Sequence, residues 1–120
     1  MGGDEKIENE KGIEKEHEIV VERDDAKDIK FTGVLLASTT NKDNISSRWV
    51  DCAVYKTAGG SFVYSEISVT LWQNEHNTHS GEKFDSLGKL FKWLEGAEPF
   101  TGAAKALAHD AGFDMTEHID

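Results

Sequence analysis

The sequence predicts an α+β fold: an antiparallel three-stranded sheet, with a four-stranded sheet as the alternative, and two C-terminal helices packed on one face. Two observations predict this class. Strand-forming residues without a helical period fill most of residues 29–73, and two stretches with helical spacing follow residue 84. Because a hairpin alone is only marginally stable in water, we expect the helices to supply the second layer of the core.

Residues 1–28 differ in composition from the rest of the chain. They hold 11 acidic and five basic residues, which is −6 of the formal net charge of −10. Their few apolar residues are too sparse to offset the entropy of ordering a chain, ~1–2 kcal/mol per residue. We therefore expect a disordered acidic N-terminal segment over 1–28 and a single α+β domain over 29–120. The stretch HEIVVE, residues 17–22, is an alternative candidate for a short edge strand.

Three strands are expected in order. The first covers DIKFTGVLLAST, residues 28–39, and ends at the polar turn TNKDNISS. The second runs from about Arg48 to Lys56 and the third from about Ser61 to Gln73, on either side of the small residues 58–60. The dipeptide Lys83-Phe84 is the candidate stub of a fourth strand.

Two helices are expected after the strands. The first has the i, i+3, i+4, i+7 apolar spacing of an amphipathic helix, at Leu87, Leu90, Phe91 and Leu94. Asp85 or Ser86 would cap its start, and Gly96 would end it in the left-handed conformation. A second helix opens at Thr101, presents a stripe of small apolar residues and stops at Gly112.

The register of the hairpin decides which residues share a face, because a slip of one residue exchanges the two faces. A two-residue loop of Ala58 and Gly59 would pair Val54 with Val63 and Cys52 with Ser65, on an apolar face beneath the helices. The opposite face would then be open and would carry four aromatic rings and two acids. We interpret it as an interaction surface made of Trp49, Asp51, Tyr55, Phe62, Tyr64 and Glu66.

Two groups of residues are candidates for chemistry. In the expected register Asp51 lies opposite Glu66, and two carboxylates can act as acid and base or hold a hard cation. His76 and His79, at i, i+3 spacing, are possible further ligands, although two ligands and one loop do not complete a metal site. Cys52 is expected to pack in the core. The sequence predicts no catalytic residues, metal site or cofactor with any specificity.

Charge and hydropathy restrict the partners. A molecule of formal charge −10 is repelled by nucleic acid and by anionic membranes, so direct nucleic-acid and membrane binding are not expected. The sequence has no apolar run near the ~20 residues of a membrane span, and no secretory signal pattern. One cysteine excludes an internal disulfide. We expect a cytoplasmic protein.

These observations favour a non-enzymatic protein-interaction module. Its partner would be a protein with a basic surface, and a sharper version is an acidic inhibitor or mimic that binds a basic nucleic-acid-binding protein where phosphates would bind. Two alternatives stay open: a small metal-dependent hydrolase that uses Asp51, Glu66 and the His76/His79 loop, or a homodimeric scaffold in which the partner is a second copy.

Overall fold

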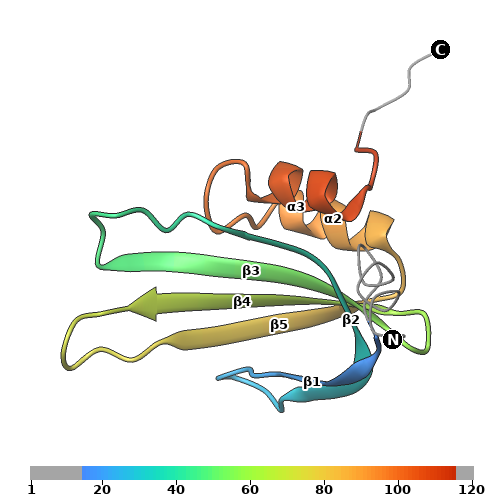
Figure 1. The fold of residues 1–120 in the computed structure, drawn as a ribbon, viewed down its shortest axis with the longest axis horizontal. Coiled ribbons are helices and arrows are strands. Elements are labelled where there is room, and N and C mark those ends of the chain that lie inside the picture. The colour runs from blue at the N-terminus through green and yellow to red at the C-terminus, as the bar shows by residue number, and fades with distance from the viewer. Residues whose placement is uncertain (1–14, 116–120) are drawn as a thin grey trace, which may run out of the picture.

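The structure is a computed structural model in which residues 15–115 are described. The fold is α+β, as predicted, with an antiparallel sheet and two helices. The elements in order are β1 (His17–Val21), β2 (Ile29–Thr40), β3 (Arg48–Thr57), β4 (Phe62–Thr70), β5 (Thr78–Phe84), α2 (Leu87–Glu95) and α3 (Ala103–Ala111). Both helices lie on one side of the sheet, and β1 lies on the other (Figure 1). Within residues 15–115, no helix combines the length and the apolar character that a membrane crossing requires.

The sheet has five strands, so the expectation of three or four is wrong in number. The strands pair in sequential order, β1-β2-β3-β4-β5. The edge strand considered for HEIVVE is present as β1, which means that the sheet begins within the acidic segment and not at Ile29. β5 is a full strand and not a stub at Lys83-Phe84. Its sequence, THSGEKF, is mostly polar and lacks the alternating apolar residues that predict a strand. Residues 1–14 of the expected arm lie outside the described residues.

The sheet curls into a half-barrel. A bulge between Leu35 and Ala37 shifts the register of β2 against β3, and bulges bend strands. The chain after β1 reaches the opposite edge of the sheet, where the Asp24 N–H donates to the carbonyl of His79 at 3.0 Å. β1 also packs closely on β5. The two strands are so near that a Cβ added at Gly81 would lie 2.7 Å from Cγ1 of Val21.

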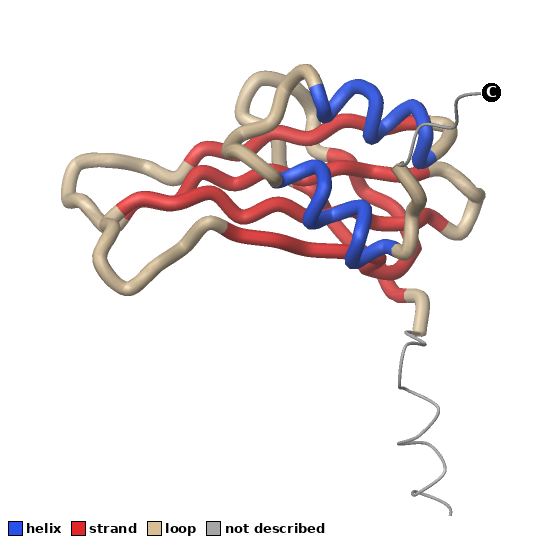
Figure 2. The backbone as a smooth tube through the Cα atoms, turned by 90° about the horizontal axis from the view of Figure 1, so that it is seen from above, coloured by secondary structure: helices blue, strands red, loops and turns tan. Residues whose placement is uncertain are grey.

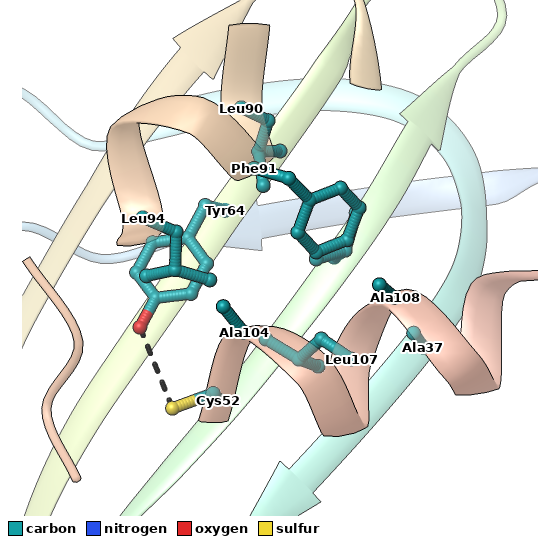
Figure 3. Packing of buried hydrophobic residues seen from close by; sticks show 10 residues of the cluster. Ala37, Cys52, Tyr64, Leu90, Phe91, Leu94, Ala104, Leu107 and Ala108 are labelled. Carbon is teal, nitrogen blue, oxygen red and sulfur yellow. Dashed lines mark hydrogen bonds between the residues drawn. The ribbon is translucent and has the colours of Figure 1, made fainter. Parts of the chain in front are cut away.

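Apolar residues fill both sides of the curled sheet. The main core lies between the helices and the convex face, and it includes Cys52, Val54, Tyr64, Leu90, Phe91, Leu94, Ala104 and Leu107 (Figure 3). A smaller cluster on the concave side joins β1 to the sheet, and it consists of Ile19, Val21 and Val63 with the partly buried Ile29, Phe31 and Tyr55.

The helix ends follow the sequence except at the end of α2 and at the start of α3, which was expected at Thr101. The Ser86 hydroxyl caps α2 by accepting from the Lys89 N–H at 3.1 Å, and Gly112 ends α3 with a φ of 73°. Gly96 ends α2 in the right-handed region instead of the left-handed one, since its N–H is satisfied there by the carbonyls of the last turn. α3 begins at Ala103, and the Glu98 carboxylate accepts from the Ala104 N–H at 2.7 Å.

The expected β3–β4 register is wrong by one residue. Val54 pairs with Tyr64, Tyr55 with Val63 and Cys52 with Glu66. The physical reason is the loop, which has three residues instead of two. The Thr57 N–H donates to the Ser61 carbonyl at 2.9 Å, and Gly60 adopts a φ of 91°. A glycine in the left-handed region at the third loop position is the usual solution for a three-residue hairpin.

Candidate interaction site

The corrected register divides the expected interaction surface between two faces. Trp49, Asp51 and Tyr55 of β3 lie on the concave face, away from the helices, as expected. The β4 residues Phe62, Tyr64 and Glu66 alternate with Val63, which belongs to the concave cluster, and therefore lie on the convex face. The six side chains do not form one surface.

Tyr64 is a core residue with a polar anchor. Its side chain is 1% exposed and its ring packs edge-on against Trp93 at 5.5 Å between centroids. Its hydroxyl donates to Oε1 of Glu66 at 2.7 Å and also lies 3.4 Å from Sγ of Cys52 (Figure 3). Burial raises the pKa of the Tyr64 phenol far above its usual range and that of the Cys52 thiol to about 11. A buried, protonated thiol is a packing group and not a nucleophile.

The two carboxylates expected to act together are separated by the sheet. Asp51 pairs with Ile67 on the concave face, whereas Glu66 lies on the convex face beside Tyr64. Within residues 15–115 no three His, Cys, Asp or Glu side chains are grouped so that they could hold a metal ion. The acid–base or cation site considered for Asp51 and Glu66 is therefore not assembled.

The two histidines also have different surroundings. His76 lies in the loop before β5 and lines a shallow hollow of about 540 Å³ together with Arg48. His79 lies on β5, where its two ring nitrogens are each 3.4 Å from a carboxylate, one from Glu22 and one from Asp24. The backbone N–H of His79 also donates to Oδ2 of Asp24 at 2.8 Å, so this histidine helps to close the half-barrel.

The concave side retains a partly exposed surface next to the cluster that joins β1 to the sheet, and Tyr55 borders both. We call it the open face and define it by Leu35, Trp49, Asp51, Tyr55 and Ile67. Cross-strand pairing brings Leu35 next to Tyr55 and Asp51 next to Ile67. Four of these residues line a shallow hollow of about 470 Å³, and Trp49 lies farther along β3 with the Lys42 ammonium 4.7 Å from its ring centroid. The open face thus combines an exposed Leu35 and three half-buried apolar or aromatic side chains with one carboxylate, and serines and threonines line the same hollow.

Exposed apolar side chains also lie at the end of the sheet that the helices leave bare. The loops at residues 41–47 and 71–77 project there, well away from α2 and α3 (Figure 2). They carry three large apolar side chains: Ile45, 89% exposed, Leu71, 68%, and Trp72, 57%. The Leu71 N–H donates to the Ser47 carbonyl at 2.9 Å, which joins the two loops.

Side-chain hydrogen bonds fix the shape of both loops. In the first, Oδ1 of Asp43 accepts from the N–H groups of Ile45 and Ser46, which lowers the pKa of that carboxyl. In the second, Glu75 accepts from Arg48 Nε at 3.1 Å and from the Thr70 hydroxyl. These hydrogen bonds lower the pKa of Glu75 to about 2, and the bond from Arg48 has the largest effect. The apolar side chains are thus held outward by ordered loops.

The sequence predicted that Trp49, Asp51 and Tyr55 lie on the face away from the helices, and it did not single out Ile45, Leu71 and Trp72. The available signal was an isolated Ile45 inside the polar turn and a Leu71-Trp72 pair at the end of a strand.

In comparisons with protein-family models, with curated proteins and with solved structures, this chain has no significant match.

Proposed function

We propose that this protein is a non-enzymatic interaction module whose open face binds a protein with a basic surface. The observation that carries the proposal is the open face itself. Trp49, Asp51 and Tyr55 lie together on a part of the sheet that the helices do not cover. Protein interfaces combine an apolar, aromatic centre with a few polar contacts, and this surface has that composition.

Asp51 supports a basic partner. It is half-buried between Ile67 of β4 and Thr40 of β2, and a lysine or arginine of a partner would reach it from the concave side. A charge-assisted hydrogen bond made there is stronger than one made on an open surface. The apolar groups would supply contact area, and Asp51 would select the sign of the partner's charge.

The overall charge supports the same partner. Residues 15–115 hold 16 acids and 11 bases, a net charge of −5, and the whole chain carries −10. Several acids lie at the turn after β1, at Glu22, Asp24, Asp25 and Asp28. Such a field attracts basic proteins and repels DNA. The more specific proposal is that this chain competes with nucleic acid for a basic nucleic-acid-binding protein.

A displacement assay tests this proposal. Purified basic nucleic-acid-binding proteins are each bound to a fluorescent DNA duplex, and fluorescence anisotropy follows the release of the duplex as this chain is added. We expect release from at least one protein at low salt and much less at high salt, because charge attraction is screened. Asp51→Lys should weaken release by tenfold or more, on the order of the loss of one charge-assisted contact.

The matched control is Val20→Ser. Val20 is 52% exposed on β1 and lies outside the open face, so this variant should release DNA as the wild type does. If no protein releases its duplex, the competitive role is wrong. If Asp51→Lys releases DNA as well as the wild type, the open face is not the contact surface.

A further inference from the structure

β2 has an outer edge that is only partly covered by another strand. β2 spans Ile29–Thr40, and β1 pairs with it only from Ile29 to Gly33. Among the residues that the structure describes, no strand lies along the outer edge of residues 36–40. The stretch 31–41, FTGVLLASTTN, also contains no charged residue. An uncharged strand with an open edge is a place where a further strand can add.

The backbone groups of Ser38 face this outer edge. The Asn41 N–H donates to the Val50 carbonyl of β3 at 3.3 Å, so the backbone of Asn41 faces β3. Ser38 pairs with Ala53 in the same register. Because the backbone groups of successive residues point to opposite sides of a strand, those of Ser38 point away from β3.

Asp110 of α3 occupies the place that an added strand would need. α3 packs over this half of β2, where Ala37 belongs to the same core cluster as Ala108 (Figure 3). Two residues after Ala108, the Asp110 carboxylate reaches the edge, and its Oδ2 accepts from the Ser38 N–H at 3.0 Å. An added strand would need this N–H for one of its own carbonyls. It would have to displace a charged acceptor, which binds an N–H more strongly than a neutral carbonyl does.

Asp110 is an unfavourable residue for the helix that carries it. α3 spans Ala103–Ala111, so Asp110 lies in its last turn. Aspartate has a low helix propensity, and the helix dipole disfavours a negative charge near the C-terminus. Residues that break such local rules are expected where another contact compensates for them. Here the compensating contact is the hydrogen bond from Ser38.

We propose that the contact between Asp110 and Ser38 is autoinhibitory, because it blocks the pairing of β2 with the same edge of a second copy of this chain. Two antiparallel strands can pair about a two-fold axis, so this edge is complementary to itself. With Ser38 near the axis, the two Asp110 carboxylates would meet, and like charges across a strand pair repel. Asp110 thus acts twice: it occupies the Ser38 N–H, and it keeps a negative charge at the edge. Charged side chains are a common protection of edge strands.

Sedimentation velocity over roughly 5–500 µM, a range suited to weak association, tests the proposal. Asp110→Ala should form more dimer than the wild type at each concentration. Asp85→Ala is the matched control, because it removes one negative charge from an exposed side chain that pairs with Lys89, and it should sediment as the wild type does. Asp110→Ala combined with Ser38→Pro should also return to the wild-type behaviour, because proline has no N–H to donate to an added strand.

Amide hydrogen exchange, followed by NMR in dilute solution, checks the contact itself. The Ser38 N–H should exchange roughly tenfold faster or more in Asp110→Ala than in the wild type, the change expected when a hydrogen bond to a charged group is lost. In Asp85→Ala its exchange rate should stay at the wild-type value.

The proposal is wrong if Asp110→Ala is folded by circular dichroism and forms no more dimer than the wild type. Equal dimer formation by Asp110→Ala with and without Ser38→Pro would place the contact on another surface and overturn it as well. Asp110→Asn keeps a neutral acceptor of the same shape and should form an intermediate amount of dimer, and it replaces Asp110→Ala if that variant does not fold. Failure of both variants to fold would overturn the proposal, because Asp110 would then serve the core and not the edge.

Discussion

Truncation of Tyr64 tests the side-chain arrangement on which the open face depends. In the register expected from sequence, Tyr64 would lie on the exposed face and its removal would have little effect. In the structure it is 1% exposed, and it packs against Trp93 beneath the helices. The free energy of unfolding of Tyr64 variants therefore distinguishes the two arrangements.

The magnitudes follow from the contacts. Tyr64→Ala removes a fully buried ring, which costs ~3–5 kcal/mol in protein cores. That is a large share of the ~5–15 kcal/mol that stabilises a typical domain. Tyr64→Phe keeps the ring and removes only the hydroxyl that donates to Glu66, so we expect a loss of ~1–2 kcal/mol. Ile45→Ala, at an 89% exposed position, should change stability by less than ~0.5 kcal/mol.

Urea denaturation followed by tryptophan fluorescence measures these differences. With a slope of ~2 kcal/mol per molar urea, Tyr64→Ala should lower the midpoint by roughly 2 M and Tyr64→Phe by roughly 0.5–1 M. If Tyr64→Ala costs no more than Ile45→Ala, then Tyr64 does not lie in the core and the register described above is wrong.

Three further predictions concern single positions. Gly33→Ala should strongly destabilise the fold, because the added Cβ would overlap the backbone carbonyl oxygen of Lys56, and thermal unfolding measures this. Burial raises the pKa of Cys52 from 9.0 to about 11, so its thiol ionises at lower pH in the unfolded chain than in the folded one. The stability that this difference contributes should be fully present below pH 9 and should be lost as the pH rises toward 11. Cys52→Ala should make the free energy of unfolding less dependent on pH in this range. The Arg48 pair lowers the pKa of Glu75 from 4.5 to about 2, so the small stabilisation from this pair should be present above pH 4.5 and lost as the pH falls toward 2; a carboxyl NMR titration should show Glu75 ionised at pH 3.5, and a midpoint near 4.5 would contradict the pairing.

The elements that could be predicted from sequence are those with a clear period or a strong end signal. Apolar spacing located α2 through Leu87, Leu90 and Leu94, and Ser86 and Gly112 marked helix ends. β5 had no such signal, because its polar sequence is held in place by pairing with β4 and not by alternating burial. Likewise β1 is ordered by packing on Gly81 and pairing with β2, contacts that the local sequence does not reveal.

For the candidate site, the sequence could predict which face the β3 residues occupy but not which face the β4 residues occupy. Alternation along β3 correctly placed Trp49, Asp51 and Tyr55 away from the helices. The β4 half depended on the length of one loop, and both a two-residue and a three-residue loop fit the sequence Ala58-Gly59-Gly60. One extra loop residue moved Phe62, Tyr64 and Glu66 to the other face.

The most direct test of the account is a solution NMR measurement of which side chains lie on each face of β4. Nuclear Overhauser contacts report proton pairs that are close in space. Tyr64 ring protons should contact the indole of Trp93 on α2, and cross-strand contacts should link Cys52 with Glu66. Contacts from the Tyr64 ring to Leu35 or Ile67, with cross-strand contacts between Cys52 and Ser65, would contradict the open face and the function proposed for it.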